Sequence, residues 1–111
     1  MKNIIPFIAF FISLQLSAQV SGDIKDDNRN LLSTTDFTIQ SNVKGEMYFK
    51  ISVNIEGEVT TASLDREKST VKSTPNMIKA KNMIMHFVFE KGTHYPKFHQ
   101  GVVKIIFTEQ D

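Results

Sequence analysis

The sequence of 111 residues contains no cysteine and has almost no net charge. Without cysteine the chain can form neither a disulfide nor a thiol lipid anchor, so a domain of this size depends on its core alone. The 13 basic and 12 acidic residues give a formal charge of +1, and this balance argues against a dedicated nucleic-acid-binding protein. The length allows one small domain.

Apolar residues are concentrated at the N-terminus, where they make up 12 of the first 18 residues. Lys2, the apolar run 4–16 and the small residues Ser17 and Ala18 form the three parts of a secretory signal peptide. As a helix the run would span about 20 Å, which is short of the ~30 Å hydrocarbon core of a bilayer. We therefore expect residues 1–18 to be a signal peptide cleaved after Ala18. The mature chain would be periplasmic or secreted, with no stable membrane insertion; the alternative is an uncleaved anchor.

Residues 19–44 are mostly polar and contain no proline. Charged and amide side chains dominate from Asp23 to Asn30, a composition typical of flexible segments. We predict a largely flexible leader over 19–44, in which residues 37–39 could add an edge strand or a short turn against the core.

Residues 47–55 alternate between apolar and polar side chains, and this period of two predicts a β-strand with one face on the core. Glu56-Gly57 follows as a tight turn, because glycine adopts the positive φ that such turns need. Residues 59–64 then resume with β-favouring threonines. The two strands are expected to form an antiparallel hairpin.

Thr74-Pro75 marks the start of a predicted helix, since the hydroxyl can cap free N–H groups and proline is tolerated in the first turn. The apolar side chains that follow lie at three- and four-residue spacing and predict about three helical turns packed on the core. They are Met77, Ile78, Ala80, Ile84, Met85 and Phe87. An adaptable methionine-rich binding face is the alternative.

The β-branched run 102–107 predicts a final strand, with Val103, Ile105 and Phe107 facing the helix. Residues 45–108 are thus expected to form a small α+β domain, followed by a tail over 109–111. It would contain a small antiparallel sheet (β-hairpin, helix, β-strand) with one helix packed on one face.

Three pieces, in order, carry a family resemblance: residues 49–60, the strand, acidic-glycine turn and strand; residues 76–89, a helix with a central alanine and an aromatic close; and residues 100–107, the closing strand. The chain resembles the C-terminal domain of the TonB family over about residues 45–108. The resemblance implies a non-enzymatic periplasmic module that binds an extended peptide of an outer-membrane partner at the edge of its last strand.

Carried over to this sequence, the resemblance implies partner binding by the last strand and the loop before it. The positions are His99, Gln100, Gly101, Val102, Lys104 and Ile106. One alternative leaves this edge unused, and another pairs it with a second copy in a structural homodimer.

The chain also departs from the energy-transducing members of that family, which keep an uncleaved membrane helix and a long proline-rich spacer. Residues 19–42 are short and contain no proline, so they cannot cross a periplasm. We therefore expect a stand-alone relative of the contact module.

Candidate residues for chemistry are few. His94 and His99, with Glu90 nearby, are a weak zinc signal because they lie five residues apart with no firm third ligand. His86 is expected to be a partly exposed helical residue. The sequence has no cysteine nucleophile and no Gly-x-Ser-x-Gly motif. We expect no enzymatic activity, no metal and no cofactor.

Basic side chains predominate between residues 66 and 104, a stretch that contains eight basic and two acidic residues. Such a surface could steer an acidic peptide or an anionic lipid headgroup, and the alternative is an ordinary solvated face. Its members are Arg66, Lys68, Lys72, Lys79, Lys81, Lys91 and Lys97.

Overall fold

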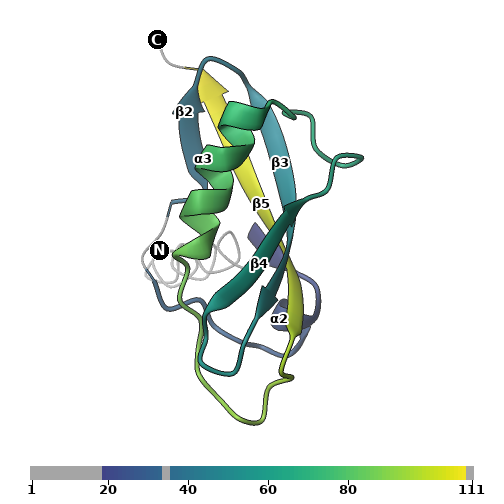
Figure 1. Ribbon diagram of the computed structural model, residues 1–111, viewed down its shortest axis with the longest axis vertical. Helices are drawn as coiled ribbons and strands as arrows, with labels where there is room; N and C mark the ends of the chain where they lie inside the picture. The colour runs from purple at the N-terminus through teal and green to yellow at the C-terminus, as the bar shows by residue number, and fades with distance from the viewer. Residues whose placement is uncertain (1–18, 34–35, 110–111) are drawn as a thin grey trace, which may run out of the picture.

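The computed structural model describes residues 19–33 and 36–109. The predicted signal peptide and the last two residues lie outside this part of the chain. The elements, in chain order, are β1 (Val20–Ser21), α2 (Asp23–Asp26), β2 (Thr38–Ser41), β3 (Gly45–Val53), β4 (Val59–Leu64), α3 (Thr74–Met85) and β5 (His99–Glu109) (Figure 1). The predicted α+β class is confirmed, with five strands and two helices where three strands and one helix were expected.

The strands form one sheet in the order β1-β5-β3-β4, with β2 also paired to β5. β3 pairs antiparallel with β4 and, along its whole length, with β5. β1 and β2 both lie on the other side of β5, β1 antiparallel and β2 parallel. β5 is therefore an interior strand with a partner on each side.

The β3–β4 hairpin confirms the predicted turn. Gly57 has φ of 85°, in the region that glycine occupies without steric cost. The side-chain oxygen of Asn54 accepts hydrogen bonds from the N–H groups of Glu56 and Glu58. These bonds hold the turn, and the register shifts once, between Ser52 and Val53.

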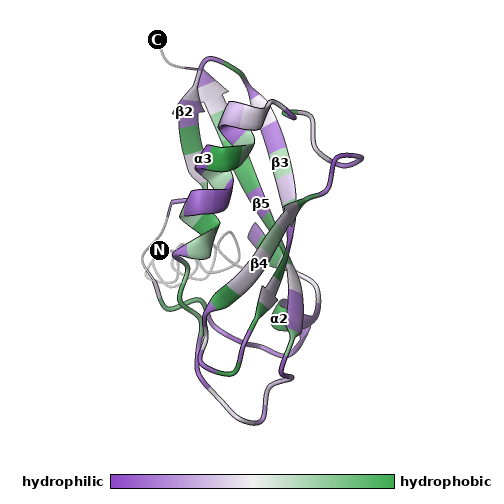
Figure 2. Ribbon diagram, viewed as in Figure 1, coloured by the Kyte–Doolittle hydropathy of each residue, from purple (hydrophilic) through white to green (hydrophobic). Residues whose placement is uncertain are grey.

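The core lies between the sheet and α3, which crosses in front of β3 and β5 in Figure 1. The residues predicted to face the helix from the last strand, Val103, Ile105 and Phe107, are buried. Phe37 and Phe87 meet edge to face, with ring centroids 5.6 Å apart. Figure 2 shows apolar residues along β5 and α3. The largest fully buried side chains include Phe49, Phe87, Phe89, Phe107, Ile24, Met47, Ile51 and Ile84.

Helix α3 begins at Thr74 as predicted, but Ser73 rather than Thr74 occupies the cap position. The Ser73 hydroxyl accepts a hydrogen bond from the Asn76 side chain and makes no capping bond to the backbone. Asn76, Ala80 and Ile84 form the buried face, because residues four apart lie on one side of a helix.

Two residues of the predicted apolar stripe therefore point elsewhere. Ile78 and Met85 are exposed, since they are rotated well away from the face that Ala80 and Ile84 bury. The prediction that the whole stripe packs in the core is wrong at these two positions. Met77 and Met83 are partly buried against the core.

The leader, which the sequence predicts to be largely flexible, contains regular structure. It contributes β1, α2 and β2 to the structure, and its apolar residues Ile24 and Phe37 are buried in the same core as the strands. Without the leader, the edge of β5 that faces away from β3 would be unpaired; β1 and β2 cover it, and Ile24 and Phe37 pack into the core. Residues 38–41 form the edge strand that was considered possible. Across the described residues no helix is long and apolar enough to cross a membrane.

Candidate functional site: the edges of the sheet

The last strand, where partner binding was expected, is already paired on both sides. Ser21 is opposite Val102, and Thr38 is opposite Ile106. The Ile106 N–H donates to the Phe37 carbonyl at 2.8 Å. In a strand the N–H and C=O of one residue point to one side, and those of the next residue point to the other side. The backbone groups of Val102 and Lys104 therefore point to the same side as those of Ile106, toward the leader. The leader thus occupies the edge that the resemblance assigned to a partner.

The six predicted binding residues fall into two groups. Val102, Lys104, Ile106 and Gln100 lie on one face of β5, and of these only Gln100 is exposed. Lys104 lies 3.4 Å from the Glu46 carboxylate. Gly101 and His99 lie on the other face and are buried. A Cβ on Gly101 would sit 2.7 Å from the Ile24 Cδ1 atom, so α2 packs directly on this glycine.

His99 is the centre of a polar network that the sequence did not reveal. Its side chain is 1% exposed, with Nε2 2.7 Å from an Asp27 carboxylate oxygen and Nδ1 3.1 Å from the Arg29 guanidinium. The Tyr95 ring stacks on the imidazole at 5.5 Å. Two residues of the leader therefore meet the first residue of β5.

Arg29 ties this network to the rest of the chain. It donates to the carbonyls of Glu90 and Asn54 at 2.8 and 2.7 Å, and its guanidinium lies 4.1 Å from the centre of the Tyr95 ring. Burial lowers the pKa of Arg29, although Tyr95 and Glu90 act in the opposite direction. Burial also raises the pKa of Tyr95, and the Glu90 carboxylate that accepts its hydroxyl hydrogen adds to the rise.

His99 has no free ring nitrogen for a metal. Both ring nitrogens of His99 are engaged, by Asp27 and Arg29, while His94 is exposed and stacks on Tyr95. No group of three or more His, Cys, Asp or Glu side chains that could hold a metal ion occurs within 19–33 and 36–109. His86 is exposed and lies at the C-cap of α3, directly after the helix in which it was expected, with Nδ1 2.7 Å from the Asn82 carbonyl.

The opposite edge of the sheet is formed by β4. The Asp65 N–H donates to the Tyr48 carbonyl of β3, so by alternation the backbone groups of Ala62 and Leu64 point away from β3. Among the described residues these groups have no backbone partner, and the only pairing on this side is the Glu58–Val88 bridge at the start of the strand. Residues 59–64 also contain no charged residue and no proline, the usual protections of an edge strand.

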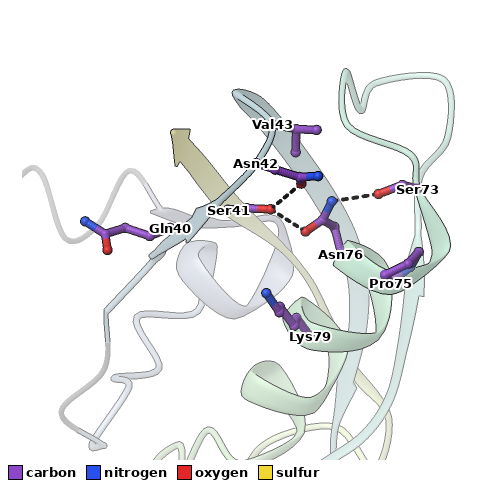
Figure 3. Close-up of a pocket in the computed structure, with 8 residues that line it drawn as sticks. All are labelled: Gln40, Ser41, Asn42, Val43, Ser73, Pro75, Asn76 and Lys79. Carbon is purple, nitrogen blue, oxygen red and sulfur yellow. Dashed lines mark hydrogen bonds between the residues drawn. The ribbon is translucent and has the colours of Figure 1, made fainter. Parts of the chain in front are cut away.

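A hollow of about 490 Å³ lies where β2 ends and α3 begins (Figure 3). On its floor the Ser41 hydroxyl donates to the Asn76 side-chain oxygen, and the Asn76 amide donates to Ser73. Ser41 and Asn76 are buried and bonded to each other, Ser73 is exposed, and Lys79 adds the one charged side chain of the lining. Among its lining residues no nucleophile is paired with a base.

The basic residues predicted to form a surface are all exposed. They come from three separate segments: the loop after β4, helix α3, and the loop before β5. The Lys68 ammonium lies 5.6 Å from the centre of the Tyr48 ring, beside the β4 end of the sheet.

Comparisons with known proteins assign the chain to no family. No protein-family model matches this chain, and neither the curated proteins nor the solved structures give a significant match.

Proposed function

We propose that this chain is a non-enzymatic protein-interaction module that binds an extended peptide by β-strand addition at the outer edge of β4. The observation that carries the proposal is the unpaired, uncharged stretch around Ala62 and Leu64. β5, the strand first expected to bind, has partners on both sides. β4 offers the free backbone groups that strand addition requires.

The magnitude of edge pairing sets what the partner must supply. The N–H and C=O groups of Ala62 and Leu64 allow four hydrogen bonds, worth about 1 kcal/mol each after the exchange with water. A total of about 4 kcal/mol corresponds to a Kd near 1 mM. Backbone pairing alone therefore gives weak binding, and side chains of the peptide must provide the rest.

Exposed apolar side chains at one end of β4 are suited to that contribution. Val88 bridges with Glu58 just before β4, and the Leu32 N–H donates to the Val88 carbonyl at 2.7 Å. Leu32 and Val88 are 59% and 46% exposed. A partner peptide with a large apolar residue at the corresponding end would cover both, with a gain of about 25 cal/mol for each Å² removed from water.

The test uses linear peptides of about ten residues, long enough to span a strand, selected from a displayed library against the immobilised chain. The binding site of each selected peptide is then mapped by comparing the NMR amide shifts of the free and the bound protein. We expect the amide protons of Ala62 and Leu64 to shift and to become protected from exchange. Binders that leave both amides unchanged and perturb another surface would overturn the proposal.

Two lysine variants test the same edge. Ser63→Lys places a charge on β4, where lysine blocks pairing, through a side chain that is exposed. Gln100→Lys is the matched control, because it adds the same charge at an exposed position on the interior strand β5. We expect at least a tenfold loss of peptide affinity, about 1.4 kcal/mol, in Ser63→Lys alone.

An uncharged edge can also pair with its own copy, which is the second candidate function: a structural homodimer joined through β4. Sedimentation at increasing concentration separates the two. A tight dimer that Ser63→Lys dissociates and Gln100→Lys preserves would favour the homodimer over peptide binding.

We further propose that the chain works outside the cytoplasm, as a stand-alone relative of the TonB contact module with an envelope protein as its partner. The support is the signal-peptide pattern of residues 1–18 and the order β3, β4, α3, β5, which matches the order of the resembling segments. Mass spectrometry of the exported protein tests the first part, with Gln19 as the expected N-terminus and an intact Met1 as the contrary result.

A further inference from the structure

Residues 19–30, the latched segment, cover one edge of β5 through a small set of contacts. β1 pairs with Val102 and Val103, and α2 places Ile24 against Gly101; Figure 1 shows α2 beside β5. β1 has two residues and α2 has four, too few to be stable alone. The segment therefore depends on its contacts with β5 for its position, and the His99 network attaches its C-terminal end.

The hydrogen bonds of His99 assign its protonation state. Arginine has only donors, so the Nδ1 atom that contacts Arg29 at 3.1 Å must accept. The Asp27 carboxylate accepts from Nε2–H at 2.7 Å. This arrangement requires a neutral imidazole with its single hydrogen on Nε2, and a protonated ring would point an N–H at the guanidinium.

We propose that His99 is a pH-sensitive latch, and that its protonation releases Arg29 and frees the latched segment from the edge of β5. A second cation next to Arg29 would be buried, because His99 and Arg29 are 1% and 5% exposed. Burying like charges without a compensating bond is costly. The ion pair gained with Asp27 offsets only part of this cost, since that carboxylate is 52% exposed and water screens it on its outer side.

The groups around His99 support the proposal that protonation of His99 destabilises its contact with Arg29. Tyr95 stacks on the ring and its hydroxyl is 3.3 Å from Glu90, so the Glu90 carboxylate is directed at Tyr95 and the Asn30 N–H. From β3 the neighbour in register is Val53, which carries no charge. Asp27 is thus the one acidic group in direct contact with the imidazole among the described residues, opposed by Arg29 on the other nitrogen.

Release would uncover a second edge of the sheet. Val102 and Val103 would lose their pairing with β1, while β2 remains paired with residues 106–109. The inference does not depend on the proposed function of β4, since it concerns the attachment of this chain's own segment.

The test follows the chain at about pH 7.5 and about pH 5, on either side of the ordinary titration range of histidine. The ¹⁵N shifts of the imidazole report its tautomer and its protonation. Hydrogen exchange of the Asp26, Asp27 and Arg29 amides, which are bonded within the segment, reports its attachment. After correction for intrinsic rates, we expect protection of these amides to fall by about tenfold or more at the lower pH.

The key variant is His99→Gln, whose side chain can donate to Asp27 and accept from Arg29 without titrating. We expect the latched segment to stay protected at both pH values in this variant. His86→Gln and His94→Gln are the controls, because both residues are exposed and neither contacts the segment. They should keep the pH response of the parent chain.

A disulfide provides a second control in a chain without cysteine. Ser21→Cys with Val102→Cys joins two residues that are opposite in register, and oxidation should abolish the release. The proposal is overturned if the parent segment stays protected while the ¹⁵N shifts show a protonated His99. It is equally overturned if His99 stays neutral at the lower pH, or if His99→Gln releases the segment with the same pH dependence.

Discussion

Residues 45–109 and residues 19–44 contribute to the same sheet but are held in different ways. The first region forms β3, β4, α3 and β5, which pair or pack with one another over long stretches. In the second region, the contacts of β1, α2 and β2 with the rest of the fold are mainly to β5, with few residues each. We therefore expect residues 45–109 to unfold as one cooperative unit and the leader to detach from it separately.

A core substitution in each region should produce the largest effects and show whether this distinction holds. Phe49 is fully buried on β3, and Phe49→Ala is expected to lower the free energy of unfolding by about 3–5 kcal/mol. That loss is comparable with the total stability of many small domains, so the whole chain should lose exchange protection. Chemical denaturation and amide exchange measure both effects.

Ile24→Ala is the counterpart in the leader, where the side chain is equally buried. We expect residues 19–30 to lose protection while residues 45–109 keep theirs, because Ile24 packs on β5 through Gly101. If both regions lost protection together, the leader would be part of one cooperative unit with the rest.

Gly101→Ala should have an intermediate effect, about 1–3 kcal/mol, and should act at the same contact from the other side. The added Cβ would lie 2.7 Å from Ile24 Cδ1 and 3.2 Å from the Ser21 carbonyl oxygen, so the leader must move. Combining Gly101→Ala with Ile24→Ala removes the obstructing atom. We expect the double variant to lose less stability than the sum of the two single variants, whereas additive losses would argue against direct contact.

The sequence predicted the first region well because its signals are local. Alternation over residues 47–55, the Gly57 turn and the β-branched run 102–107 each reflect one element facing one core. The structure confirms these elements, with β5 running from three residues before to two residues after the predicted run, so that Glu109, expected in the tail, belongs to the strand. The errors on α3, at Ile78 and Met85, arose because three- and four-residue spacing defines a broad stripe rather than one buried face.

The contacts of the second region could not be predicted from the sequence because they are remote. Asp27 and Arg29 meet a histidine 72 and 70 residues away, and a polar run with one isolated isoleucine has no period to detect. Ile24 and Arg29 were the available signals within that run. A large apolar residue or an arginine that stands alone in a polar segment can mark the place where the segment packs on the core. The pairing of the leader with β5 could not be predicted either, because register and strand order depend on the whole sheet.

The smallest expected effect is a loss of stability at high pH that depends on Tyr95. Its pKa is raised above the ordinary value of about 10 by burial and by Glu90, so the unfolded chain releases this proton first. Stability from the neutral phenol is therefore complete below about pH 10 and declines as the pH rises through the pKa of the folded state. Urea midpoints measured across this range should fall more steeply for the parent chain than for Tyr95→Phe. Tyr48→Phe, which keeps Tyr95, should follow the parent; equal slopes in all three proteins would show that Tyr95 titrates alike in both states and that the network around His99 does not extend to its hydroxyl.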